Sequence, residues 1–336
     1  MGSDSGAQED EIAAGVAISK TAALSHRTLR KWEIQLPAER FTPVGSGFHF
    51  TETLGRDFTA AVEGTALAID SDGDGKLDVR AEGKDALITL RGRSGSGVER
   101  PYAVRLVNRE GWRFAASGVM SGRLHGTRFR LIDQNNNGSY VDYGEDAMIV
   151  GRGNIACFLS RVVNVRGKLL DISVARDGST IRATSHRGES GTLTLGPCKT
   201  KGKVLAAIIR SEDGRCSFNV ARTSRGLRVP VGSYLLHGGE IGLGENRVKF
   251  RAGRSKAITV GAGEKKEVRW GGPVSAEFAY KREGDELHLS PKQVWYFGQA
   301  GEEYYHWFPI GKSPKFTIAN LMTGREIAQA YFPGSC

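Results

Sequence analysis

The sequence predicts an all-β protein built from several β-sandwich or Ig-like modules. The chain has 336 residues, which is more than one ordinary domain of roughly 100–150 residues needs. It contains 45 glycines, and long helical patterns are scarce. Short runs with an apolar residue at every second position are bounded by Gly, Pro or Asn, which is typical of half-buried strands joined by tight turns. We expect two to four domains.

The N-terminal segment, 1–31, is polar and then weakly helical, and we expect a mobile arm or a short packed helix without a function of its own. Its first residues lack the basic and apolar regions of a signal peptide, so either the protein stays inside the cell or a leader has been removed. From Trp32 onwards the period-two pattern begins, and a first β domain is expected over 32–165. Its expected strands are 32–37, 47–53, 57–64, 65–70, 86–92, 101–108 and 112–118.

The first domain contains an internal duplication. Residues 62–92 align with residues 124–153, and both copies contain Gly-Thr, Ile-Asp, a loop glycine, Gly-x-Asp-Ala and a final Arg-Gly. We therefore predict two copies of a strand–loop–strand unit.

The first copy contains the loop DSDGDGKLD at 70–78, whose composition fits a calcium site. Calcium takes six to eight oxygen ligands, and a tight loop supplies them by placing carboxylates at alternate positions before a glycine. The predicted ligands are Asp70, Asp72 and Asp74, the carbonyl of Lys76, Asp78, and Glu82 or Asp85 as the closing ligand. Magnesium fits less well, because it retains water rather than accept an all-protein cage.

This loop resembles the D-x-D-x-D-G loops of EF-hands, dockerins and related extracellular calcium repeats. It differs from EF-hands in two respects: the segments on either side are β-like, and the twelfth position is Ala81 instead of Glu. The alternative interpretation is that Asp, Asn and Gly only form turns here.

The second copy repeats the layout in DQNNNGSYVD at 133–142 with fewer charges, because two positions carry Asn instead of Asp. We therefore expect weaker calcium binding in this loop. The predicted ligands are Asp133, Asn135, Asn137, the carbonyl of Ser139, Asp142, and Glu145 or Asp146. The shared Gly-x-Asp-Ala favours Asp85 and Asp146 as the closing ligands of the two loops.

Two further modules are expected after the duplicated domain. Residues 166–271 predict a sandwich of about seven strands, and its later part, 229–268, resembles carboxypeptidase-regulatory-like or PEGA-type modules through VPVGSYLL and ITVGAGEKKEV. Residues 272–336 predict a small Ig-like module rich in aromatic residues. As a whole, the chain resembles bacterial extracellular multidomain β proteins with such calcium loops.

Charge and aromatic residues suggest possible partners. Residues 199–270 hold 16 Lys or Arg and 6 Asp or Glu, so 16 − 6 = +10, which equals the net charge of the whole chain. This excess could attract an anionic polysaccharide or an envelope surface, although it is also what the wet face of a sheet contains. Nucleic acid is not favoured. The possible sugar-stacking residues, which could equally form a core, are Trp295, Tyr296, Tyr304, Tyr305 and Trp307.

Signatures of catalysis are weak, and no transmembrane segment or catalytic residue is predicted. The four cysteines include one local pair, Cys198 and Cys216, which are either bridged or free buried thiols. The leading hypothesis is a non-catalytic calcium-binding structural or adhesion-type protein that is extracellular, periplasmic or on the cell surface. Its partner would be a polysaccharide or another envelope protein. The alternatives are a carbohydrate-binding or anionic-polysaccharide-binding module and, less favoured, a calcium-dependent hydrolase.

Overall fold

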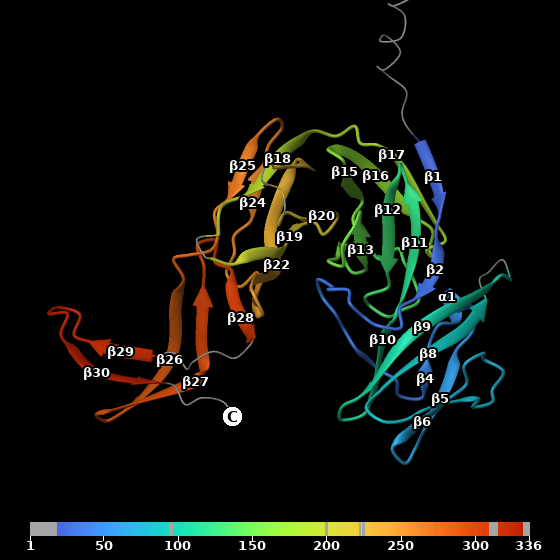
Figure 1. The fold of residues 1–336 in the computed structure, drawn as a ribbon, viewed down its shortest axis with the longest axis horizontal. Coiled ribbons are helices and arrows are strands. Elements are labelled where there is room, and N and C mark those ends of the chain that lie inside the picture. The colour runs from blue at the N-terminus through green and yellow to red at the C-terminus, as the bar shows by residue number, and fades with distance from the viewer. Residues whose placement is uncertain are drawn as a thin grey trace, which may run out of the picture.

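The structure is a computed structural model that describes residues 19–93, 97–198, 201–221, 223, 226–308 and 315–331. Nearly all regular structure in this part of the chain is β, in several sheets, as the sequence predicted. Figure 1 shows the chain as an arch, with the first module (blue to cyan) and the C-terminal hairpins (orange to red) at opposite ends. No helix of the described residues is long and apolar enough to cross a membrane.

The first module is a sandwich of two four-stranded sheets around one aromatic-rich core. Phe48, Phe50 and Phe58 from one layer meet Tyr102 and Phe114 from the other. The first sheet contains β4 (Gly47–Phe48), β5 (Phe58–Glu63), β6 (Ala66–Ile69) and β7 (Val79–Ala81). The second contains β3 (Thr42–Pro43), β10 (Trp112–Ala116), β9 (Glu99–Asn108) and β8 (Asp85–Arg93).

The second module is also formed by two sheets, and it includes the beginning of the described chain. Its core joins Leu124, Phe129 and Leu131 to Ile172 and Ile181. One sheet contains β14 (Cys157–Phe158), β13 (Ala147–Val150), β12 (Thr127–Ile132), β11 (Gly118–Leu124) and β2 (Ser25–Thr28). The other contains β1 (Ser19–Ala23), β17 (Thr180–Ser185), β16 (Lys168–Val174) and β15 (Val162–Val165).

The third module packs a large sheet on a small one around Trp270, Phe250 and Tyr234. The large sheet contains β20 (Ser217–Asn219), β19 (Lys203–Ser211), β22 (Gly232–Leu243), β23 (Asn246–Arg251), β28 (Glu303–Phe308), β27 (Glu286–Phe297) and β26 (Ser275–Glu283), with β24 (Ile258–Val260) on β22. The small sheet contains β21 (Leu227–Pro230), β18 (Ser190–Leu195) and β25 (Lys265–Val268). A separate hairpin is formed by β29 (Lys315–Ala319) and β30 (Glu326–Tyr331).

The sheets extend across the expected boundaries. The sheet that holds β15 continues through β16 and β17, so the structure has no break between residues 165 and 166. Strands β26 to β28 belong to the large sheet of the third module instead of forming a separate sheet after residue 271. The boundaries were placed at shifts in composition. Pairing of strands across a boundary does not change the local composition, so it could not be seen there.

Three local expectations were wrong. Residues 19–28, expected as part of a mobile arm or helix, form β1 and β2, which pair with β17 and β11. Segment 32–37 has one isolated bridge, Gln35 to Ile155, instead of a strand. The expected strand 47–53 ends at Phe48 and is followed by the helical turn α1 (Thr51–Leu54).

The turn α1 forms because Asp57 supplies acceptors for its first amides. Asp57 Oδ1 accepts hydrogen bonds from the backbone N–H groups of Phe50 and Thr51 at 2.8 and 3.0 Å and from Thr51 Oγ1 at 2.8 Å. The turn ends at Gly55, whose φ of 75° lies in the left-handed region that favours glycine. A residue six positions after the start of the turn therefore overrides the local strand pattern.

Candidate metal centre

The first acidic loop connects two antiparallel strands of one sheet. Strand β6 ends at the fully buried Ile69, the loop begins with the buried Asp70, and β7 returns at Val79, which lies opposite Ile69. The loop is therefore a long hairpin connection, as the β-like sequences on either side of it predicted, and it has no flanking helices.

The Asp70 carboxylate organises the loop from inside. Its Oδ1 accepts hydrogen bonds from the N–H groups of Gly73 at 2.6 Å and Asp74 at 3.2 Å, and its Oδ2 accepts one from Gly75 at 2.8 Å. Gly75 has a φ of 89°, which a side chain would strain. The amides of the turn therefore point towards the first aspartate and curl the chain around it.

The curled loop brings three carboxylates together. Oxygen atoms of Asp70, Asp72 and Asp74 all lie within 4.8 Å of one another, with Asp70 buried and the other two exposed. Two ligands of a calcium ion, each 2.3–2.6 Å from the metal, lie up to about 5 Å apart, so this separation fits a shared cation. The side chain of Lys76 lies 3.6 Å from Asp74 Oδ2 and compensates only part of the negative charge.

Asp78 has a different role from the other acids of the loop. Its two oxygens accept hydrogen bonds from the N–H and the hydroxyl of Ser71, at 2.7 and 2.8 Å. Partial burial acts to raise the pKa of Asp78, but the hydrogen bonds from Ser71 outweigh it and hold that pKa below its usual value. Asp78 therefore clamps the two ends of the loop together and stands outside the group of three carboxylates.

The second loop repeats the hydrogen bonds of the first. It connects β12 to β13, where Ile132 pairs with Ala147. Asp133 Oδ2 accepts from Gly138 N–H at 2.6 Å and Oδ1 from Asn137 N–H at 3.2 Å, matching the bonds that Asp70 accepts from Gly75 and Asp74. Asn137 Oδ1 accepts from Ser139 N–H at 2.8 Å, as Asp74 Oδ1 accepts from Lys76 N–H at 2.8 Å. The two loops share one local geometry through the sixth and seventh positions.

The loops differ in how their negative charges are balanced. In the second loop the side-chain amides of Asn135 and Asn137 both donate to Asp142 Oδ2, at 3.1 and 2.7 Å. Asp133 is fully buried and accepts a further hydrogen bond of 2.6 Å from the Tyr102 hydroxyl on β9. Amide and hydroxyl donors thus balance the negative charge of the second loop. The three carboxylates of the first loop are not balanced by side-chain donors of this kind.

The closing acids occupy comparable places directly before the returning strands. Asp146 precedes β13 and accepts from Gln134 N–H at 3.3 Å, as Asp78 precedes β7 and accepts from Ser71 N–H. Burial, reinforced by the neighbouring Asp133 carboxylate, raises the pKa of Asp146, and burial also raises the pKa of Asp133. Asp85, in contrast, is exposed at the start of β8 and is not among the grouped carboxylates. Asp78 is therefore the structural counterpart of Asp146.

Residues of the α1 region contact both loops, and sequence reasoning did not find them. Arg56 donates a hydrogen bond to the carbonyl of Asp72 in the first loop, and Thr53 Oγ1 donates to the carbonyl of Asn137 in the second at 3.3 Å. A Cβ atom on Gly73 would lie 2.2 Å from Arg56 Cδ, and one on Gly138 would lie 2.3 Å from Thr53 Oγ1. Both loops therefore use glycine where this short turn approaches closely.

The aromatic residues of the C-terminal strands divide between core and surface. Tyr304 is buried and packs on Phe250, with ring centroids 6.0 Å apart, and Tyr296 packs against the same core. Trp295 is half-buried, and Tyr305 is 39% exposed with the Arg251 guanidinium 5.2 Å from its ring. The side chain of Trp307 lies outside the described residues. The four expected stacking residues whose side chains are described therefore do not form one exposed platform.

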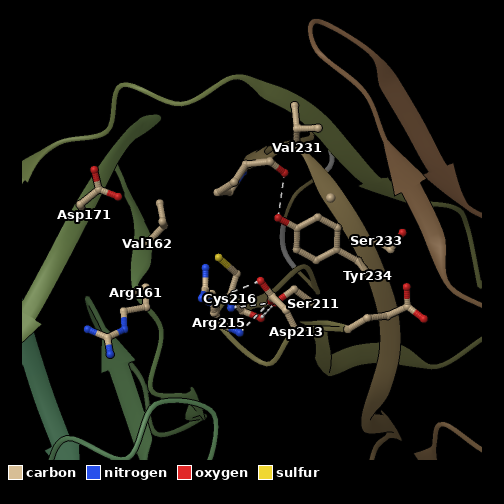
Figure 2. Close-up of a pocket in the computed structure, with 13 residues that line it drawn as sticks. Arg161, Val162, Asp171, Ser211, Asp213, Arg215, Cys216, Val231, Ser233 and Tyr234 are labelled. Carbon is tan, nitrogen blue, oxygen red and sulfur yellow. Dashed lines mark hydrogen bonds and ion pairs between the residues drawn. The ribbon is translucent and has the colours of Figure 1, made fainter.

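A cleft with a volume of about 620 Å³ lies between the second and third modules (Figure 2). Its walls carry both signs of charge, including Arg161, Asp171, Asp213 and Arg215. Cys216 in its wall is free, and burial raises the pKa of its thiol to about 12, so it is not an activated nucleophile. Because the Cys216 thiol is free, the bridge considered between Cys198 and Cys216 is absent.

Comparison of the chain with protein-family models, curated proteins and solved structures finds no match.

Proposed function

We propose that the protein is a non-catalytic structural protein whose first module is stabilised by calcium bound to the loop 70–78. The observation that carries this proposal is the convergence of Asp70, Asp72 and Asp74 to within 4.8 Å in a loop organised by backbone amides. Carboxylate oxygens are the ligands that calcium prefers. The carbonyl of Lys76, at the seventh position, would complete the protein ligands in this loop.

The bound cation would act on stability, because the loop lies between paired strands. Three negative charges in one loop repel one another, and a divalent cation converts this repulsion into attraction. Binding to the folded state alone stabilises it by RT ln(1 + [Ca²⁺]/Kd). The pairing of Ile69 with Val79 would thus be held by metal in the first loop, and the pairing of Ile132 with Ala147 mainly by the amide donors of the second.

We place such a protein outside the cell, in the periplasm or on the cell surface. Sites of modest affinity, with Kd values of about 10⁻⁴–10⁻³ M, stay filled only where calcium is near millimolar, as in extracellular modules. A polysaccharide or another envelope protein is the proposed partner. Several cations of the basic segment are already paired with acids, including Arg247 with Glu240, Arg251 with Glu303 and Lys266 with Glu264. Carbohydrate binding is therefore secondary to the calcium proposal.

The proposal is tested by titrating calcium into the chelator-treated full chain, with calorimetry and thermal unfolding as the two readouts. We expect saturable binding, a raised unfolding midpoint, and a much smaller effect of magnesium at the same concentration. A second, weaker binding event would belong to the loop at 133–146. Absence of both heat and a midpoint shift at millimolar calcium would overturn the proposal.

A further inference from the structure

The edge of the large sheet in the third module exposes an unusual combination of side chains. Strand β26 is the last strand in the sheet order and pairs only with β27 among the described strands. Phe278 is 50% exposed and Tyr280 is 63% exposed, and their ring centroids lie 6.3 Å apart. Soluble proteins normally protect such an edge with a bulge, proline or inward-pointing charge, because its free N–H and C=O groups accept another strand.

In the β26–β27 hairpin, the edge strand β26 is free of extra, bulged residues. Between the pairs Phe278–Val294 and Tyr280–Leu289, β26 advances by two residues while β27 advances by five. The extra residues therefore lie in β27, and β26 remains continuous. Every residue of β26 except Ala279 is exposed, on both faces of the strand, so a further strand on its free edge would cover apolar side chains and stabilise it.

We propose that β26 pairs with the β26 strand of a second copy of this chain, in antiparallel orientation and centred on Ala279. This inference is independent of the calcium proposal. A twofold axis perpendicular to a sheet places one residue opposite its own copy, so only a few registers are possible. With Ala279 on the axis, Glu277 lies opposite Lys281 of the second copy, and Phe278 lies opposite Tyr280 of the second copy. Symmetry repeats each pair, which gives two opposite-charge pairs and a cluster of four aromatic rings.

Neighbouring registers lose this complementarity. An axis at Tyr280 places Glu277 opposite Glu283, and an axis at Glu277 or Lys281 places that charge opposite itself, which destabilises a strand pair. An axis at Phe278 places Glu277 opposite Ala279, so Glu277 of each copy lacks a basic residue opposite it on the other strand. Only the register centred on Ala279 combines matched charges with matched aromatic residues.

The local ion pairs of the strand are compatible with this arrangement. Glu277 Oε1 accepts a hydrogen bond of 2.6 Å from Arg254, and a carboxylate has a second oxygen that can accept from a lysine. Lys281 contacts Glu283 within its own strand, and its ammonium group has three donors. Both side chains are exposed, with relative exposures of 45% and 77%, so each can reach across to a second strand.

Cysteine crosslinking of the full chain tests the register directly. Residues opposite each other in an antiparallel pair have Cα atoms about 4.5 or 5.5 Å apart, and both distances allow a disulfide. Ala279→Cys should therefore give a covalent dimer under mild oxidation. Ser275→Cys is the matched control on the same strand: it lies four residues from the axis, so its own copy is about 26 Å away and should not crosslink. The unsubstituted chain provides the blank for the four native cysteines.

Sedimentation velocity over a concentration series tests the association without oxidation. We expect a reversible dimer in the parent chain and a monomer in Phe278→Ser/Tyr280→Ser. The control Leu321→Ser/Met322→Ser removes apolar side chains that are 98% and 92% exposed on the other hairpin and should leave the dimer unchanged. Equal crosslinking of both cysteine variants, a monomeric parent, or loss of the dimer in the control would overturn the proposal.

Discussion

Replacing Asp74 with Asn separates the calcium hypothesis from a turn-only role of the loop. Asp74 Oδ1 accepts a hydrogen bond of 2.8 Å from Lys76 N–H, and the side-chain oxygen of Asn can accept the same bond. The substitution therefore keeps the local turn and removes one charge from the group of three. We expect opposite effects on stability with and without calcium.

The magnitudes follow from the separation of the carboxylates. Two unit charges at the outer limit of 4.8 Å repel by about 1 kcal/mol in a water-like dielectric, so removing Asp74 from two such pairs relieves on the order of 2 kcal/mol without metal. With calcium at ten times Kd, the parent gains about 1.4 kcal/mol. At about 4–8 °C per kcal/mol for a module of this size, this gain corresponds to about 6–11 °C in Tm. A tenfold weaker site in the variant would retain about 0.4 kcal/mol of it.

The assay is thermal unfolding of the parent and Asp74→Asn, each with a chelator and with millimolar calcium. Asp213→Asn is the matched control. Asp213 also precedes a glycine and a basic residue, its Oδ1 accepts a hydrogen bond of 2.9 Å from Arg215 N–H, and it does not belong to the carboxylate group. We expect Asp213→Asn to retain the full calcium response. An equal calcium response in parent and Asp74→Asn, or a variant destabilised to the same extent in both conditions, would contradict calcium binding by this loop.

Two further predictions concern the buried Tyr102 and the half-buried His237, both outside the first loop. Tyr102→Phe should lower the free energy of unfolding by about 1–3 kcal/mol in a urea titration, because it removes a donor from the buried Asp133 carboxylate. The control is Tyr234→Phe, which removes a hydroxyl that donates to the neutral carbonyl of Pro230, and it should lower the free energy of unfolding by less. Equal losses in the two variants would contradict the role of the charged acceptor. Burial lowers the pKa of His237 in the folded chain. Below about pH 6.5 the unfolded chain therefore binds a proton at His237 more readily than the folded chain does, so the free energy of unfolding falls as the pH decreases. His237→Gln should reduce the loss in urea midpoint between pH 7.5 and pH 5, and an unchanged pH dependence would exclude His237 as its source.

The sequence carried the fold class and the loop geometry because both depend on local patterns. Alternation of apolar residues predicted β5, β6, β8 and β9 within one or two residues. The spacing of Asp70, Asp72, Asp74 and Gly75 determines the loop, since each acceptor bonds an amide only a few residues away.

The parts that sequence reasoning missed depend on distant contacts. Nothing local marks Tyr102 as a partner of Asp133, because the two residues meet only after different sheets pack together. Asp78 ends the loop and Asp85 follows it, and the shared Gly-x-Asp-Ala favoured Asp85 as the closing residue. The hydrogen bonds from Ser71 show instead that Asp78 closes the loop. The strands β1 and β2 were missed because their partners, β17 and β11, are 90 or more residues away.

The turn α1 couples the two loops mechanically. Arg56 and Thr53 lie three residues apart on this short segment, and each donates to a loop carbonyl, Arg56 to the first loop and Thr53 to the second. Asp57 fixes the segment by accepting the amides at its start. A cation that orders the first loop would therefore also hold Arg56 in place, and through the same turn would limit the movement of the second loop. Because the second loop balances its charges with its own amides, calcium bound at the proposed site in the first loop would be sufficient to hold both hairpins in register.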